Sequence, residues 1–364
     1  MSVTKEQVEA ALKQYIDPYL EKDPVTAGVV KDIAIDGGEV KVKIVLGYPA
    51  FGFVDKLSAD LKAKIEAVDG VTSAEVDAGW EIGSHSVQGG MNPLEGIKNV
   101  IAVASGKGGV GKSTTAVNLA LALSARGNSV GLLDADVYGP SQQAMLGVAA
   151  DVRPEQPGGQ FLLPVKAHGL KTMSMGYLVT EKTPMVWRGP MAGGALAQML
   201  EQTLWGELDY LVIDMPPGTG DIQLTLSQKA RVAGAVIVTT PQDIALQDAR
   251  KGIEMFRKVD IPILGVIENM AVHTCSQCGH QEHIFGEHGG ERISRDYGVP
   301  LLASLPLALS IREQTDSGNP TVVAEPDSPV AALYMAAAAA VEASLAGQGD
   351  SVVKPFPEIQ ITDD

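Results

Sequence analysis

The sequence predicts an α/β fold, with a mostly parallel, doubly wound sheet that is preceded by a small α+β domain. From residue 99 to about residue 345, short apolar runs alternate with helical patterns, which is typical of parallel sheets covered by helices. The first of these runs, residues 100–104, leads directly into the glycine-rich stretch 106–113 and then into a helical pattern. Residues 1–82 instead predict the order helix, strand, strand, helix, strand, which indicates a separate compact module.

The composition limits the classes of protein to which this chain can belong. Its 364 residues are enough for two or three domains, and its formal net charge is −16. This acidic balance disfavours nucleic acid or an anionic membrane as a main partner, because both attract clustered Lys and Arg. The first residues are polar, so we expect no signal peptide. We expect no stretch long and apolar enough to span a bilayer, and the nearest candidate, residues 330–341, is predicted to be a packed helix.

The two cysteines, Cys275 and Cys278, also bear on the setting of the protein. They are too close in sequence to staple a fold. Cysteine usage of this kind indicates a reducing environment, so we expect a cytoplasmic location.

Local signals predict the small N-terminal module, residues 1–82. Thr4 and Gln7 form a capping-box pattern at the start of a helix that should end near residue 16, before Pro18. The other predicted elements are two strands joined by a hairpin, a helix and a last strand: residues 29–35, 39–46, 53–68 and 71–76. The module has no cysteine and no cluster of histidines or carboxylates. We therefore expect it to serve in interaction or positioning.

The rest of the chain divides by composition. Residues 83–98 are rich in Gly, Ser, Asn and Pro and are predicted to be a linker. His85 is alone in this stretch, so we expect its side chain to be solvated. A nucleotide domain is expected over residues 99–345, and residues 346–364 are expected to be a loose acidic tail.

Residues 106–113 have the phosphate-loop pattern of Gly, four residues and Gly-Lys-Ser. A triphosphate is bound by many backbone N–H groups at close range, and glycines let the backbone bend tightly enough to supply them. The helix that follows adds its free N-terminal amides. Lys112 is expected to contact the β- and γ-phosphates, and the Ser113 hydroxyl to bind Mg²⁺. A glycine-rich turn without a ligand is the alternative, which the agreement of motif and context disfavours. The expected nucleotide-binding residues here are Gly106, Lys107, Gly108, Gly109, Val110, Gly111, Lys112, Ser113 and Thr114.

Polar residues follow several predicted strands, where a parallel α/β sheet places its functional groups. Asp134 and Asp136 end one strand and are expected near Mg²⁺ or an attacking water, with an N-cap or turn role as the alternative for either. Asp214 ends an apolar strand in the Walker B form and is expected to hold Mg²⁺. The Gly218 amide is a candidate to contact the γ-phosphate. Asn269 follows a later strand, where its amide either reads adenine or forms a turn.

The segment 273–280 (HTCSQCGH) is the second candidate centre. Its Cys-x-x-Cys-Gly pattern lets two thiolates face one metal, and the glycine frees backbone N–H groups to point at sulfur. A redox dithiol is disfavoured, because the motif follows a late strand of a nucleotide fold. A zinc site would be completed within the chain by His280 and His283. An iron–sulfur cluster normally takes four thiolates, and with two cysteines in the chain it has to be shared between two chains.

Taken together, these motifs resemble the Mrp/ApbC family of P-loop ATPases that carry iron–sulfur clusters. The match covers residues 99 to about 345. It rests on GKGGVGKS, LLDADVYGPS, DMPPGTGD, VIENM and CSQCG followed by IFG and GG. More broadly, the chain resembles the deviant-Walker ATPases that include MinD and ParA.

The resemblance implies roles for several residues. Lys107 reaches across a homodimer to the partner's nucleotide, Asp136 belongs to switch I near the hydrolytic water, Asp214 serves Mg²⁺ and Asn269 contacts adenine. From the motifs and the resemblance together, Lys107, Lys112 and Asp136 are the candidate catalytic residues, and Cys275, Cys278 and Ser113 the candidate metal ligands. The N-terminal module resembles the small iron–sulfur assembly domain that is often fused to this family. That domain usually has a cysteine after its second strand, where this chain has Pro49-Ala50-Phe51-Gly52.

The leading hypothesis is a homodimeric carrier that binds ATP and Mg²⁺, hydrolyses ATP slowly and delivers a shared 4Fe-4S cluster to apo-proteins. Its expected partners are a second copy, apo iron–sulfur client proteins and the cluster assembly machinery. One alternative is a ParA/MinD-like positioning ATPase with a structural zinc knuckle, which predicts a basic face or a basic terminal helix. The predicted terminal helix, residues 328–345, has neither Lys nor Arg. A metabolic ATPase or kinase is the third possibility.

Overall fold

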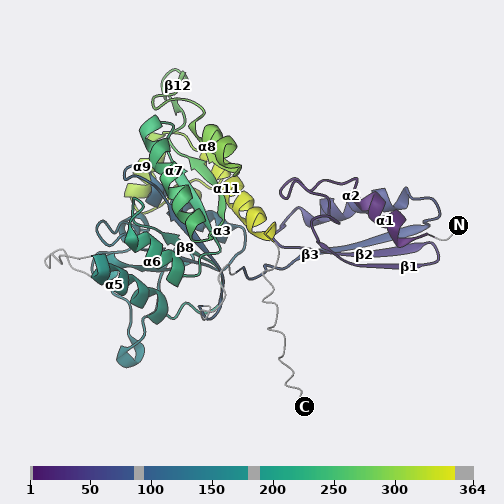
Figure 1. Ribbon diagram of the computed structural model, residues 1–364, viewed down its shortest axis with the longest axis horizontal. Helices are drawn as coiled ribbons and strands as arrows, with labels where there is room; N and C mark the ends of the chain where they lie inside the picture. Colours follow the sequence, from purple (N-terminus) through teal and green to yellow (C-terminus); the bar gives the residue numbers. More distant parts are fainter. Residues whose placement is uncertain (1–2, 86–93, 179–188, 349–364) are drawn as a thin grey trace, which may run out of the picture.

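The computed structural model describes residues 3–85, 94–178 and 189–348. It has a small N-terminal domain beside a larger α/β domain, and the end of β3 and the C-terminal end of α11 lie between them (Figure 1). The predicted fold class is confirmed: a large, mostly parallel sheet with helices is accompanied by a small three-stranded sheet.

The N-terminal domain has the predicted order of elements. They are α1 (Lys5–Leu12), β1 (Val30–Asp36), β2 (Glu39–Leu46), α2 (Val54–Glu66) and β3 (Ser73–Trp80). Strand β2 lies in the middle, antiparallel to β1 and parallel to β3. The capping box of Thr4 and Gln7 is present. The helix ends at Leu12 and not near residue 16, because the chain tightens after it into turns such as Gln14 N–H to Ala11 O.

The large domain is built on an eight-stranded sheet with the order β13-β10-β9-β4-β8-β5-β7-β6. All neighbouring strands are parallel except β6 and β7. The strands are β4 (Ile97–Ala104), β5 (Val130–Asp134), β6 (Val165–Ala167), β7 (Leu170–Ser174), β8 (Leu208–Asp214), β9 (Gly234–Thr239), β10 (Ile263–Glu268) and β13 (Leu301–Ser304). A separate hairpin is made of β11 (His273–Thr274) and β12 (Gln281–Glu282).

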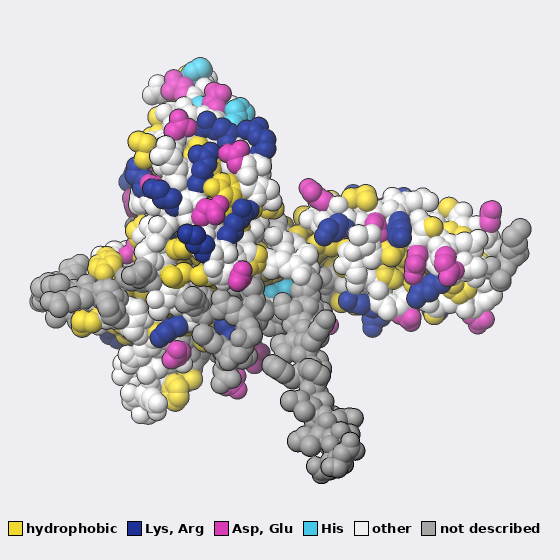
Figure 2. Space-filling model, in the orientation of Figure 1, with side chains coloured by type: hydrophobic (Ala, Val, Ile, Leu, Met, Phe, Trp, Pro, Cys, Tyr) yellow, Lys and Arg dark blue, Asp and Glu magenta, His cyan; other side chains and the backbone are white. Residues whose placement is uncertain are grey.

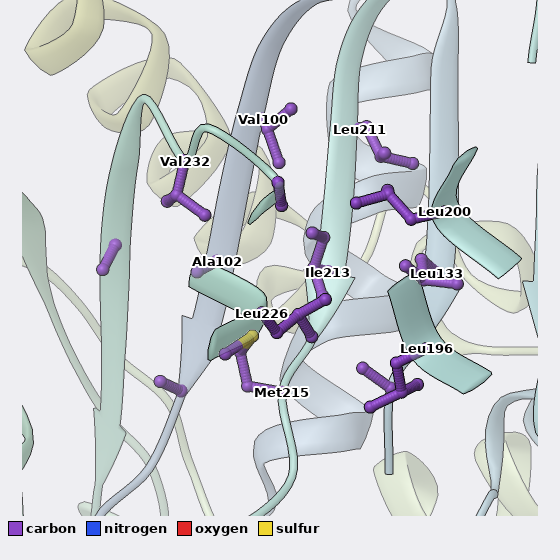
Figure 3. Packing of buried hydrophobic residues seen from close by; sticks show 14 of the residues in the cluster. Val100, Ala102, Leu133, Leu196, Leu200, Leu211, Ile213, Met215, Leu226 and Val232 are labelled. Atoms are coloured by element: carbon purple, nitrogen blue, oxygen red, sulfur yellow. The ribbon is translucent and has the colours of Figure 1, made fainter. Parts of the chain in front are cut away.

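Helices cover both faces of this sheet, and the side chains of β4 show how. Val100 and Ala102 enter one apolar cluster, and Ile101 and Val103 enter the other. The first cluster packs against α5 (Gly189–Gln202), α6 (Asp221–Lys229), α7 (Asp243–Lys258) and α8 (Gly289–Tyr297); Figure 3 shows part of it. The second packs against α3 (Lys112–Ala125) and α11 (Pro329–Ala346). The remaining short helices are α4 (Gln142–Met145), α9 (Leu309–Asp316), α10 (Thr321–Ala324) and the 3₁₀ helices η1 (Pro157–Gly159) and η2 (Met175–Tyr177). Because both faces are buried, the central strands are apolar over most of their length.

Helix α11 corrects one expectation. By length and composition alone it is apolar enough to cross a membrane, although no such stretch was expected. Half of this apolar window is buried in the protein, and Tyr334, Ala338 and Val341 lie in the cluster shared with α3. The predicted packed helix is therefore confirmed.

His85 corrects another expectation. The residue is only 6% exposed, because hydrogen bonds with Asn99 of β4 hold residues 83–85 against the sheet. Asn99 Oδ1 accepts the His85 backbone N–H at 3.1 Å and lies 3.0 Å from His85 Nδ1, while its amide donates to Gly83 O. The greater part of the predicted linker, residues 86–93, and of the predicted tail, residues 349–364, lies outside the described residues.

Candidate functional site: a phosphate loop and a cysteine hairpin

The phosphate loop joins β4 to α3, and its glycines are required for two different reasons. Gly109 and Gly111 have φ of +83° and +81°, which L side chains rarely adopt. At Gly106 the constraint is space, since an added Cβ would lie 2.0 Å from the Asp248 carbonyl oxygen of α7. Gly108 has neither constraint: its φ is not positive, and a Cβ there would meet no atom within 4 Å.

Lys112, the first residue of α3, is buried and contacts the carboxylate of Asp214. Its Nζ also donates to Ser113 Oγ at 3.2 Å. The structure therefore brings the phosphate-loop lysine, the hydroxyl and the Walker B carboxylate to one point. Both oxygen groups suit Mg²⁺, which prefers hard oxygen ligands.

Asp134 lies beside Asp214 at the end of β5, where the two strands pair in register. It is fully buried, and burial, followed by the nearby charge of Asp214, raises its pKa to about 7. Its carboxylate accepts hydrogen bonds from the backbone of Asp136, Ser141 and Gln142 and from the Ser174 hydroxyl. Asp134 thus anchors the loop that follows its own strand.

Asp136 is half-buried and also shapes this loop, because its Oδ1 accepts the N–H groups of Tyr138 and Gly139. Unlike Asp134, it borders a cavity of about 220 Å³ above the phosphate loop. The cavity is lined by Ser105, Lys107, Gly108, Gly109, Gly111, Lys112, Ser113, Thr114, Asp136, Ser141, Met145 and Pro217. Lys107 is exposed at its edge. Most of the predicted phosphate-binding residues therefore share one cavity.

Two other candidates are engaged within the protein. The Gly218 N–H donates to Ser105 O at 3.0 Å. The Asn269 amide donates to Val110 O of the phosphate loop at 2.9 Å, while its Oδ1 accepts the Met270 N–H. Asn269 thus braces the phosphate loop, in the manner of the turn-forming alternative, and lies close to Gly111.

Sequence reasoning assigned no role to the side chain of Gln142. Its side chain is only 1% exposed and donates to Ser113 O at 3.0 Å and to Asp214 Oδ2 at 2.8 Å. The sequence offers no signal for this position beyond its place directly after the Asp136 loop.

The cysteines lie on the β11–β12 hairpin, which projects from one end of the molecule (Figure 1), where Figure 2 shows histidine side chains at the surface. Cys275 N–H donates to His280 O, and Gly279 N–H donates to Cys275 O in a turn where Gly279 has φ +73°. Hydrogen bonds from the backbone N–H groups of Gln277 and Cys278, and from the Cys278 thiol, lower the pKa of Cys275. The predicted orientation of N–H groups toward sulfur is thus present. Cys278 is exposed and Cys275 half-exposed.

Histidine does not complete a metal site around these thiols. Within residues 3–85, 94–178 and 189–348, no group of three His, Cys, Asp or Glu side chains is placed to hold a metal ion. His283 Nδ1 lies 2.8 Å from Ala271 O, and His280 Nε2 lies 3.6 Å from Glu282 Oε1. The zinc site that His280 and His283 would complete is therefore not formed in this structure.

Known proteins resemble this chain over nearly its whole length. The family described as NUBPL iron-transfer P-loop NTPase matches residues 96–342, and the family described as iron-sulfur cluster assembly protein matches residues 5–77. An iron-sulfur cluster carrier protein of Pseudomonas fragi is 62% identical over 75% of this chain and 96% of its own. An iron-sulfur cluster carrier protein of Escherichia coli is 48% identical over 95% of this chain and 93% of its own.

A solved structure also resembles part of this chain. It is a nucleotide-binding protein of Archaeoglobus fulgidus in complex with ADP, 37% identical, with a TM-score of 0.57. The similarity covers 65% of this chain and 91% of that protein.

Proposed function

The chain belongs to the family of NUBPL iron-transfer P-loop NTPases, and on this premise we propose that it is a homodimeric carrier that binds and slowly hydrolyses ATP and delivers a 4Fe-4S cluster to apo-proteins. The observation that carries the proposal is a pair of accessible cysteines without a third ligand among the described residues. Apo client proteins and the cluster assembly machinery are its proposed partners, and the cytoplasm is its proposed location.

The phosphate-loop cavity is the proposed ATP site. Lys112 is the first residue of α3, and its ammonium group contacts Asp214. When ATP binds, this ammonium group would leave Asp214 and contact the β- and γ-phosphates. Ser113 and Asp214 would hold Mg²⁺, which neutralises phosphate charge when bound. Asp136 borders the cavity and is the candidate for orienting water. The free N–H groups at the start of α3 bind phosphate oxygens.

The position of Lys107 is consistent with the proposed dimer. Its side chain is exposed at the edge of the cavity, where a phosphate of a facing protomer would attract it. We propose that ATP, held between two protomers in this way, stabilises their association.

The iron–sulfur cluster is the cargo in this proposal. A cluster with four thiolate ligands needs two from each of two chains, because each chain has only Cys275 and Cys278. The hairpin presents both thiols to solvent, so that two hairpins of a symmetric dimer would meet around one cluster.

We propose that strand β10 couples the nucleotide bound at the phosphate loop to the position of the cysteine hairpin. At its end, Asn269 contacts the phosphate loop, and the chain then enters the hairpin. Where the chain leaves the hairpin, Gly290 N–H of α8 donates to Glu268 Oε1 of the same strand at 3.0 Å. Both ends of the hairpin segment are therefore attached to one strand beside the ATP site.

Anaerobic reconstitution with iron and sulfide tests this function. We expect a brown dimer with about one 4Fe-4S cluster for two chains, measured by absorption, iron and sulfide content and light scattering. Cys275→Ala is expected to abolish the colour, whereas Ser276→Ala, a change between the two cysteines, is expected to retain it. A colourless protein with one tightly bound zinc per chain would contradict the proposal.

A further inference from the structure

The side chain of Gln142 lies where three parts of the ATP site meet. Its Nε2 donates to Asp214 Oδ2 at 2.8 Å and to the Ser113 carbonyl at 3.0 Å, and its backbone N–H donates to Asp134 Oδ2 at 3.0 Å. One residue therefore connects the Walker B strand, the first turn of α3 and the end of β5.

Asp214 depends on this contact in a particular way. Its carboxylate is fully buried, and among the described residues only Lys112 and Gln142 donate hydrogen bonds to it. Lys112 is also the group that phosphate attracts. When Lys112 turns to a nucleotide, Gln142 is the donor that stays on Asp214. A buried carboxylate that keeps one fixed donor retains its orientation, whereas one that loses both does not.

The oxygen of the same amide, Gln142 Oε1, is free to accept a further hydrogen bond. Gln142 Oε1 is buried and accepts no hydrogen bond within the described part of the chain. An unpartnered buried oxygen beside Ser113 and Asp214 is suited to accept a hydrogen bond from a water bound at the magnesium site. The side chain thus has polar chemistry directed at both the carboxylate and the metal hydration shell.

We propose that Gln142 is a positioning residue that orients Asp214 for Mg²⁺ and so sets the affinity for magnesium-bound ATP. The inference rests on the ATP-binding part of the proposed function and extends it to a residue outside the phosphate-loop and Walker B motifs. Gln142 itself need not touch the nucleotide.

The test compares ATP affinity in Mg²⁺ with ATP affinity in EDTA, by competition with a fluorescent ATP analogue. Gln142→Met keeps the length of the side chain and removes both polar atoms. We expect it to weaken binding about tenfold in Mg²⁺ and to leave binding in EDTA unchanged. Gln143→Met is the matched control, because the Gln143 amide donates to Ala149 O, away from the site. It should match the wild type in both buffers.

Gln142→Asn is the second variant, in case the methionine variant unfolds. It keeps an amide that is too short to span Asp214 and Ser113, so it should show the same selective loss. Equal losses in Mg²⁺ and EDTA, or no loss in either variant, would overturn the proposal. Failure of the ATP-binding part of the proposed function is recognised separately, because the wild-type protein would then bind no ATP in either buffer.

Discussion

Arg126 Nε lies 2.7 Å from the buried Glu342 Oε2, so that the end of α3 is joined to α11 by an ion pair. The same guanidinium donates through Nη2 to the Pro49 carbonyl of the N-terminal domain at 3.0 Å. The Phe51 ring also packs against this contact between the two domains, because an added Cβ at Gly127 would lie 2.6 Å from the ring. The segment that takes the place of the usual cysteine in the small domain therefore contacts the helix that begins at the phosphate loop.

Glu342 makes the free energy of unfolding of the protein depend on pH. Burial raises its pKa from 4.5 to about 7, although Arg126 and Asn128 act in the opposite direction. Because the folded state holds the proton more tightly, the contribution of Glu342 is complete below pH 4.5 and is lost as the pH rises through 7. The change across this window is about 3 kcal/mol of unfolding free energy.

We therefore expect Glu342→Gln to lose this part of the pH dependence. Between pH 5 and pH 8, urea unfolding of the variant should gain stability relative to the wild type by up to about 3 kcal/mol. Asp134 titrates in both proteins and cancels in the comparison. Parallel pH profiles of the two proteins would show that Glu342 does not titrate in this range.

Strong local patterns made most of the fold predictable. The central strands are buried on both faces, which leaves uninterrupted apolar runs such as the one that ends at Asp214. Parallel strands also place their carboxyl ends together, so Asp134 and Asp214 were expected in one region, and they pair in register. The buried residues of helix α7 recur with helical spacing among charged ones, a pattern that is visible in the sequence.

The features that escaped prediction are short strands without a clear sequence pattern and side chains placed by residues elsewhere in the chain. Strands β11 and β12 have two residues each, too few for a periodic pattern, and β6 lies after a stretch rich in proline and glycine. Gln142 acquires its role from Asp214, and His85 is buried by Asn99. Neither pairing leaves a signal near the residue itself.

The phosphate-loop glycines give a second prediction. Gly106→Ala should push the loop away from the Asp248 carbonyl of α7, from which its Cβ would be only 2.0 Å. We expect ATP affinity to fall at least about tenfold and stability to fall by about 1–3 kcal/mol. Gly252→Ala is the control, because an added Cβ there meets no atom within 4 Å and Gly252 does not line the cavity. ATP titration and thermal unfolding should separate the two variants, and equal behaviour would contradict this account of the loop.

Asn269 gives a third prediction, which separates its two candidate roles. Asn269→Ala removes the hydrogen bond to Val110 O and any contact of the amide with a base. If the amide reads adenine, as the family resemblance implies, ATP affinity should fall about tenfold and GTP affinity much less. Competition titrations with both nucleotides measure the difference. An equal loss for ATP and GTP would leave only the brace on the phosphate loop.

The histidines of the hairpin give the last prediction, which distinguishes a brace from a metal ligand. His283 Nδ1 lies within hydrogen-bond distance of Ala271 O, at 2.8 Å, at the base of the hairpin. The His280 side chain is instead 67% exposed beside Glu282. His283→Ala should still bind a cluster but lose it faster, by about fivefold, because a hydrogen bond worth about 1 kcal/mol no longer restrains the hairpin. His280→Ala should bind and release the cluster like the wild type. The decay of cluster absorption after transfer to a chelator measures both rates. If both variants instead fail to bind any metal, the imidazoles are ligands, and the thiolate-only site in a shared dimer is wrong.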